Sequence, residues 1–218
     1  MTGFLGSTVG KKYLMGISGL IWAGFVLAHM AGNLLMFISA DAYNSYGHAI
    51  TSGKIIFVAE AALILALITH VYCAITLTIQ NRASRQSKYA VAASGDKKVS
   101  KASRTMAVQG SLILVFIILH IATFKYGTHY ETTVDGVVIR DLFRLIVEVF
   151  HQPGYIFWYI VCLILLGFHL SHGVKSSFQS LGVMNGAYRS AFEKISTAYA
   201  VMVATGFIAQ PIYVYLFN

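Results

Sequence analysis

The chain is poor in charged residues and has only two cysteines. Charged residues make up 11% of its 218 residues, against about 25% in ordinary soluble domains. Cys73 and Cys162 lie alone in different apolar runs, so no CxxC spacing is present that would indicate an iron–sulfur cluster or a zinc site. The sequence also lacks a GxGxxG motif and a Walker loop, which argues against a nucleotide or flavin site within this chain.

Apolar residues dominate what is present. They make up 57% of the chain and gather in five runs, each long enough to cross a hydrocarbon core of about 30 Å as a helix. We therefore predict an all-α integral membrane protein in which residues 1–218 form a single domain, a bundle of five transmembrane helices. The predicted helices cover about residues 13–39, 54–80, 104–127, 153–181 and 194–217.

The basic residues predict the orientation of this bundle. Four of them, Lys54, Lys125, Arg140 and Arg144, fall on one side of the predicted membrane. The other twelve fall on the opposite side: Lys11, Lys12, Arg82, Arg85, Lys88, Lys97, Lys98, Lys101, Arg104, Lys175, Arg189 and Lys194. By the positive-inside rule, the N-terminus is inside and the C-terminus is outside. The net charge of +8 is then explained by topology and anionic lipid, without a nucleic-acid partner.

Two connections on the predicted outside are informative. Residues 40–53, rich in Tyr, Asn, Ser and Gly, are expected to form a short loop. In the second connection, VDGV is typical of a tight hairpin turn, and DLFRLIVEVF has the spacing of an amphipathic helix lying at the membrane interface.

Four of the apolar runs each contain a histidine at a matched depth, about sixteen residues from the start of the run. An imidazole within a bilayer is costly, so this recurrence needs a cause. Because successive helices run in opposite directions, His29 and His120 are predicted near the outside face, and His70 and His169 near the inside face. Any one of them taken alone is more often a hydrogen-bonded core residue, but the set favours ligands. Two imidazole pairs at two levels are what two stacked bis-histidine haems require, whereas a single zinc or copper site would need all four together.

The sequence resembles a known family, the single-chain, five-helix, two-haem cytochrome b anchors of succinate:menaquinone oxidoreductases and quinol:fumarate reductases. The matching stretches are GKKYLMGISGL, HMAGNL around His29, SRTM, and GFHLSHGVKSSFQSLG, and the resemblance spans about residues 9–217. In that family the ligand in helix four begins an H-x-S-x-G pattern, with a further Gly nine residues after the last. His169, Ser171, Gly173 and Gly182 reproduce the pattern, which selects His169 over His172 as the ligand.

The resemblance implies cofactors, partners and location. It implies two b-type haems, with His29 and His120 as axial ligands of the outer haem and His70 and His169 as axial ligands of the inner haem. It also implies that the chain exchanges electrons with menaquinone or menaquinol. Its partners would be a flavoprotein subunit and an iron–sulfur subunit on the cytoplasmic face of a bacterial inner membrane. The chain would then be the electron-transfer subunit of an enzyme whose soluble chemistry belongs to other chains.

Further residues are candidates because of their place at the predicted helix ends. Side chains near the inside ends are expected to meet haem propionates or to lie beside the ligands: Ser18, Arg104, His172, Lys175 and Gln179. Side chains near the outside ends are expected to serve a quinone site or a proton path: Tyr43, Asn44, Tyr46, His48, Glu60, His151 and Gln152. Glu60 is the one carboxylate within an apolar run, and burial there should favour its neutral form.

Two alternatives stay open at the level of the sequence. The chain resembles the family above, but two haems could also serve the anchor of another membrane oxidoreductase, such as a hydrogenase or a formate dehydrogenase. The inward basic loop argues against this, because those partners usually sit outside. A haem-free transporter that uses the histidines as a proton relay is the second alternative.

Overall fold

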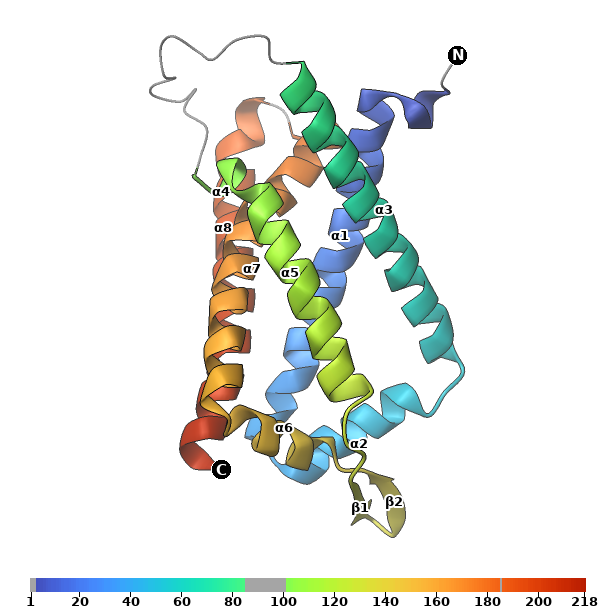
Figure 1. Cartoon of the computed structure of the whole chain (residues 1–218), viewed down its shortest axis with the longest axis vertical. Coiled ribbons are helices and arrows are strands. Elements are labelled where there is room, and N and C mark those ends of the chain that lie inside the picture. Colours follow the sequence, from blue (N-terminus) through green and yellow to red (C-terminus); the bar gives the residue numbers. More distant parts are fainter. Residues whose placement is uncertain (1–2, 85–100, 185) are drawn as a thin grey trace.

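The computed structural model describes residues 3–84, 101–184 and 186–218, and it is mostly helical. Five helices among these residues are long and apolar enough to cross a membrane, with mean hydropathy between 1.6 and 2.2, and they indicate a multi-pass membrane protein. They run up and down an elongated bundle that leaves the two termini at opposite ends (Figure 1). The helices are α1 (Thr8–Asn33), α3 (Ile55–Ala83), α5 (Met106–His120), α7 (Pro153–Ser180) and α8 (Arg189–Phe217).

The bounds of some helices differ from the predicted ones, since α1 and α8 begin earlier and α3 ends later. The first begins at Thr8, where the Ser7 side chain accepts a hydrogen bond from the backbone N–H of Gly10, and the fifth begins at Arg189. Two helices continue in other helical forms, α1 as the 3₁₀ turn η2 (Leu34–Phe37) and α5 as the π-helical turn η4 (Ile121–Lys125). Short pieces precede three of the helices: η1 (Phe4–Gly6), α4 (Lys101–Arg104) and η5 (Gly186–Tyr188).

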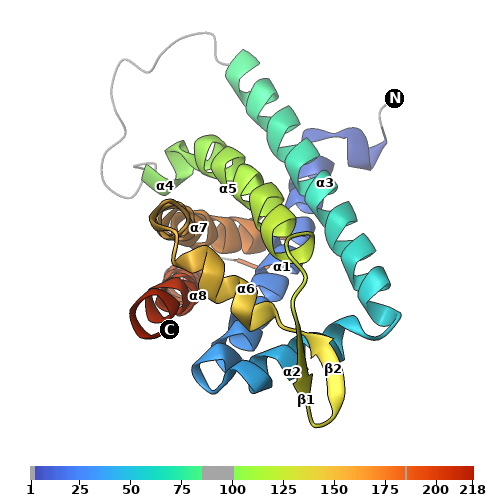
Figure 2. The same cartoon turned by 60° about the horizontal axis from the view of Figure 1, so that its bottom comes forward.

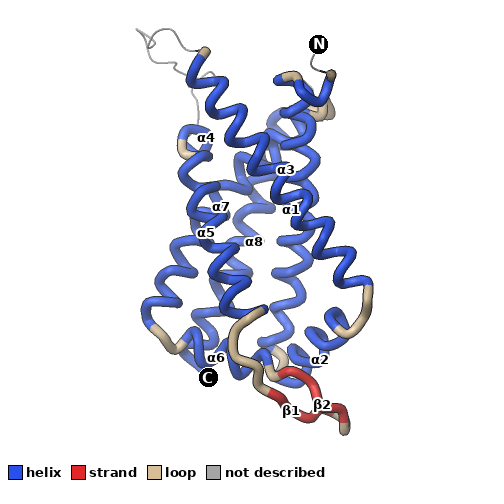
Figure 3. Tube along the Cα trace, turned by 45° about the vertical axis from the view of Figure 1, so that its right-hand side comes forward, coloured by secondary structure: helices blue, strands red, loops and turns tan. Residues whose placement is uncertain are grey.

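The remaining elements gather at one end of the bundle, which we call the hairpin end (Figure 2). They are α2 (Ala40–Thr51), strands β1 (Glu131–Val134) and β2 (Val137–Arg140), and α6 (Leu142–Phe150). The opposite end, where the N-terminus lies, has only helix ends and short turns among the described residues (Figure 3). Four of the basic residues assigned to the inside loop, Arg85, Lys88, Lys97 and Lys98, lie outside the described residues.

The prediction of a loop over residues 40–53 is wrong, because α2 occupies most of that segment. Ser39 caps this helix by accepting a hydrogen bond from the backbone N–H of Ala42 at 3.0 Å. Tyr43 and Asn44 are buried against the rest of the hairpin end. The segment is polar by composition, yet it forms a helix with one buried side, and tertiary packing supplies what the composition lacks.

The predictions of a tight hairpin turn and of an amphipathic helix at this end are confirmed, while a position of that helix at the membrane interface stays a prediction. Strands β1 and β2 pair in antiparallel register through a two-residue turn, in which Asp135 and Gly136 both have positive φ, as type I′ turns require. Helix α6 is amphipathic, and its buried side consists of Leu145, Ile146, Val149 and Phe150. Asp141 caps it by accepting a hydrogen bond from the backbone N–H of Arg144 at 3.0 Å.

The five long helices are buried to very different extents. In the most apolar 18-residue stretch of each helix, 39% of α8 is buried within the protein, but only 6% of α3 and 6% of α5. The main core lies between α1, α7 and α8 and includes Met30, Leu163, Leu170, Val203 and Phe207. Helix α3 stands at the edge of the bundle, on the far side from α7 and α8 (Figures 1 and 2). Most of its apolar surface is therefore available to lipid.

Candidate functional site

The four histidines of the long helices form two pairs in space. The ring centroids of His29 on α1 and His120 on α5 are 5.8 Å apart. Those of His70 on α3 and His169 on α7 are 6.3 Å apart. The first pair lies toward the hairpin end, because it is near the last residues of α1 and α5, whereas His70 and His169 lie midway along their helices. The structure thus brings together the residues that equal depth in antiparallel helices predicts as partners.

A backbone carbonyl and a side chain of α1 contact His70 of the second pair. Its Nδ1 lies 3.3 Å from the backbone carbonyl oxygen of Met15 and 3.4 Å from Oγ of Ser18. The Ser18 hydroxyl donates to the carbonyl of Leu14 at 2.7 Å, so it is held beside the ring. Contact with a carbonyl oxygen favours the tautomer with the proton on Nδ1, which leaves Nε2 available as a ligand.

His120 of the first pair is held in a similar way, by a side chain. Its Nδ1 lies 3.1 Å from the phenol oxygen of Tyr159 on α7. The partner His29 is placed differently, because its Nε2 lies 3.3 Å from Nδ2 of Asn33, one turn further along α1. Aromatic rings stack on both imidazoles, Phe25 on His29 and Phe116 on His120.

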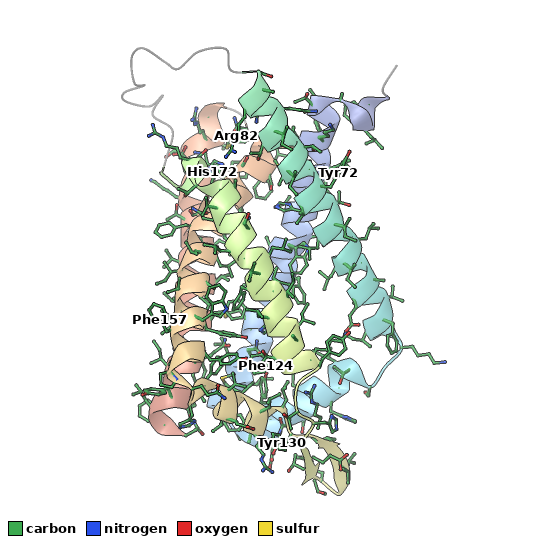
Figure 4. All side chains as sticks on the ribbon, viewed as in Figure 1. Tyr72, Arg82, Phe124, Tyr130, Phe157 and His172 are labelled. Carbon is green, nitrogen blue, oxygen red and sulfur yellow. The ribbon has the colours of Figure 1, made fainter. Side chains whose placement is uncertain are left out.

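His169, the second member of that pair, differs from His70 in its hydrogen bonding. Among the described residues, its Nδ1 is buried and has no hydrogen-bond partner. A buried nitrogen without a partner costs free energy, so such an atom calls for an explanation. Its neighbour His172, three residues further along α7, is only half-buried. It lies nearer the end of the bundle opposite the hairpin end, which we call the N-terminal end (Figure 4).

Glycines let the helices come close to the rings of the second pair. A Cβ added to Gly19 on α1 would lie 3.3 Å from Cε1 of His70, and one added to Gly110 on α5 would lie 3.6 Å from Cε1 of His169. The first of these distances is tighter than ordinary van der Waals contact. The rings therefore lie against bare backbone, as a close approach of ring or cofactor to a helix requires.

The side chains expected near the propionates are scattered. Lys175 forms an ion pair with Glu193 of α8, to which Arg189 Nε also lies 3.5 Å away, so its charge is already compensated. Arg104 and Gln179 are exposed near the N-terminal end. Of that set, only Ser18 contacts one of the four paired imidazoles.

The side chains expected at a quinone site separate into two groups. Tyr43 and Asn44 are buried and bonded within the hairpin end: the Tyr43 hydroxyl donates to Oδ1 of Asn33 at 2.9 Å, and Asn44 Nδ2 donates to Oδ1 of Asp141 at 2.8 Å. Burial raises the pKa of the Tyr43 phenol, which keeps it a neutral donor. These two residues fasten α2 to its neighbours. The other four candidates of the hairpin end are exposed: Tyr46, His48, His151 and Gln152.

Glu60 is not the isolated buried carboxylate that the sequence predicts. It pairs with Lys125 of η4, and the two side chains are 34% and 43% exposed. The ion pair joins α3 to the π-helical turn that directly follows His120. The Lys125 ammonium lies beside the carboxylate, so Glu60 is a paired and partly exposed group.

Sequence reasoning missed Tyr159, the Met15 carbonyl and Asn33. Met15 and Asn33 lie within the stretches GKKYLMGISGL and HMAGNL, but a motif does not show which of its atoms contacts an imidazole. In the described part of the chain, no group of three or more His, Cys, Asp or Glu side chains is arranged to hold a metal ion. In comparisons with known proteins, no family model, no curated protein and no solved structure matches the chain.

Proposed function

We propose that the chain is the cytochrome b membrane anchor of a succinate dehydrogenase or fumarate reductase complex, with two bis-histidine haems b. The observation that carries the proposal is the separation within each histidine pair, 5.8 and 6.3 Å between ring centroids. A metal–imidazole bond is about 2 Å long and the ring centre lies about 1 Å behind its nitrogen, so two imidazoles on opposite sides of one metal ion have centroids about 6 Å apart. Two ligands suffice for haem iron, because the porphyrin supplies the others.

The surroundings of the rings support the same proposal. His70 and His120 each present Nδ1 to an oxygen, which is the usual second contact of a metal-bound histidine. The bare backbone at Gly19 and Gly110 gives a flat macrocycle room beside the second pair. At His29, binding through Nε2 replaces the contact with Asn33. A haem supplies one-electron redox chemistry when bound, and the chain's own residues ligate it, orient the imidazoles and exclude water.

The proposal extends to partners and substrate. The N-terminal end, with its basic residues, faces the cytoplasm and docks an iron–sulfur subunit and a flavoprotein subunit. Menaquinone or menaquinol exchanges electrons and protons at the hairpin end, close to the His29–His120 pair. The exposed side chains that could contact a quinone headgroup there are Tyr46, His48, His151 and Gln152, whereas Tyr43 and Asn44 are buried and bonded within the protein. His151 would do so through Nε2, because its Nδ1 lies 2.8 Å from the carbonyl oxygen of Val147.

The experiment that tests the proposal is purification of the chain from its native membrane under mild conditions. We expect it to bring down a flavoprotein and an iron–sulfur subunit, and the complex to couple succinate oxidation or fumarate reduction to a menaquinone analogue. Subunits of a hydrogenase or a formate dehydrogenase would identify a different dihaem anchor. A haem-free protein that purifies alone would support a transporter and contradict the proposal.

A further inference from the structure

The two histidine pairs are anchored by different kinds of groups, and this difference has a functional consequence. The anchor of His70 is the backbone carbonyl of Met15, assisted by Ser18. The anchor of His120 is the single phenol oxygen of Tyr159. A backbone carbonyl is present whatever the side chain, whereas a phenol exists only because the sequence places a tyrosine there.

Tyr159 is fixed firmly by its surroundings. It is 5% exposed, and its ring packs edge-on against Phe116, Phe124 and Phe150, at centroid distances of 4.9, 6.1 and 5.0 Å. Figure 4 labels Phe124, which lies toward the hairpin end of the bundle. These contacts come from α5, η4 and α6, so three elements set the position of one phenol oxygen. A hydroxyl held this rigidly can define the orientation of the imidazole that it meets.

We propose that Tyr159 is a positioning residue for His120 and lowers the reduction potential of the haem that this pair binds, an inference that rests on the proposed function. With Nε2 committed to iron, His120 carries its proton on Nδ1 and donates a hydrogen bond to the Tyr159 oxygen. A hydrogen bond from Nδ1–H makes the imidazole a stronger electron donor, which stabilises the ferric state relative to the ferrous state. Loss of this bond therefore raises the potential.

The chain offers a matched control one turn away on the same helix. Tyr155 lies four residues before Tyr159, and its hydroxyl lies 3.4 Å from Oγ1 of Thr123 on η4. Among the described residues, no hydrogen bond joins Tyr155 to any of the four paired histidines. Tyr159→Phe and Tyr155→Phe each remove one phenol oxygen from α7 and keep the ring.

The test is a redox titration of the full complex in isolated membranes, followed by absorbance and by electron paramagnetic resonance. In Tyr159→Phe we expect one haem to become about tenfold easier to reduce, a shift of about 59 mV for a one-electron couple, while the other haem stays unchanged. The shifted haem should be the one that disappears in a His29→Leu variant. Tyr155→Phe should leave both potentials at the parent values.

Every outcome bears on the proposal. Loss of that one haem alone from Tyr159→Phe also supports it, because weaker metal binding by about 10–100-fold follows when the partner of a ligand is removed. Unchanged potentials, equal shifts of both haems, or an equal shift in Tyr155→Phe overturn it. A parent protein with no haem overturns the proposed function itself. Hyperfine spectroscopy of the parent needs no variant: it should find an exchangeable, hydrogen-bonded proton on Nδ1 of His120, and an unprotonated Nδ1 overturns the inference.

Discussion

Three of the four paired imidazoles have polar contacts of different kinds, and this is where single residues decide the site. His70 meets a backbone carbonyl, His120 a phenol, and His29 an amide, while Nδ1 of His169 has no partner in the described part of the chain. Matched depth in the sequence predicts which histidines meet. It does not predict these partners. The contact of His70 depends on which faces of α1 and α3 meet, and that of His120 on which faces of α5 and α7 meet. A tyrosine in an aromatic-rich run carries no signal of its own.

The choice between His169 and His172 on α7 gives the first prediction. His169 pairs with His70 at 6.3 Å between ring centroids, whereas His172 lies about one turn further along the helix and is half-buried. His169→Leu should lose one haem and keep the other, and His172→Leu should keep both, as measured by haem content per chain. If the two variants behave in the opposite way, the assignment on this helix is wrong.

The Glu60–Lys125 ion pair gives the second prediction. Glu60→Gln leaves Lys125 without its partner, and Lys125→Gln leaves Glu60 alone, so each single variant should lower thermal stability in detergent. The double variant should recover part of the loss, with a coupling of about 1 kcal/mol or less, because both side chains are partly exposed.

The same variants test whether Glu60 carries protons. If it does, Glu60→Gln slows turnover with quinone but leaves turnover with an artificial soluble electron carrier at the parent level. A Lys125→Gln variant, which keeps the carboxylate, is the control. Equal turnover of Glu60→Gln with both carriers limits Glu60 to the ion pair.

At the scale of elements, the apolar runs predict the long helices because hydropathy decides what crosses a membrane. The turn sequence VDGV predicts the hairpin, and the amphipathic spacing of DLFRLIVEVF predicts α6. Helix α2 is not predicted by either kind of pattern. Its attachment depends on Asn44, whose side-chain oxygen accepts from the backbone N–H of Phe143 at 3.0 Å and whose amide donates to Asp141. These partners are 99 and 97 positions away in the sequence, so the residues of α2 alone do not predict that it packs against α6.

The third prediction is that Asn44→Ala releases α2 from α6. The substitution removes the side-chain acceptor of the part-buried Phe143 N–H, at a cost of about 1–3 kcal/mol. It also removes one of the two donors to Asp141 Oδ1, which keeps its bond from the Arg144 N–H. Hydrogen exchange should become faster in residues 40–51 and 142–150 and stay at the parent rate in α7 and α8. Ser45→Ala, at an exposed neighbouring position, is the control and should change neither region. Equal exchange in both variants would show that Asn44 does not fasten the helix.

At the scale of the whole molecule, five crossings leave the two ends chemically different. The hairpin end is closed by α2, the β-hairpin and α6, whereas basic residues of the described chain such as Lys11, Lys12 and Arg82 belong to the other end. The positive-inside rule predicts that this basic end faces the cytoplasm. Because the fold alone has no membrane direction, orientation comes from the distribution of charge in the sequence.

The fourth prediction tests this orientation with a membrane-impermeant thiol reagent. Cys73 and Cys162 are buried, so the natural background is low. Val138→Cys, on the exposed hairpin, should be labelled in cells whose inner membrane is intact. Val183→Cys, exposed at the opposite end, should be labelled only after that membrane is opened. The reverse pattern would place the N-terminus outside and rule out cytoplasmic docking at the basic end.

The central claim is that each histidine pair binds one haem, and haem stoichiometry tests it most directly. Pyridine haemochrome analysis of the purified chain, with protein measured by amino-acid analysis, should give two haems b per chain. His29→Leu and His70→Leu should each reduce the value to one, with the reduced spectrum of the remaining haem preserved. A parent protein without haem, or loss of the same haem in both variants, would contradict the account.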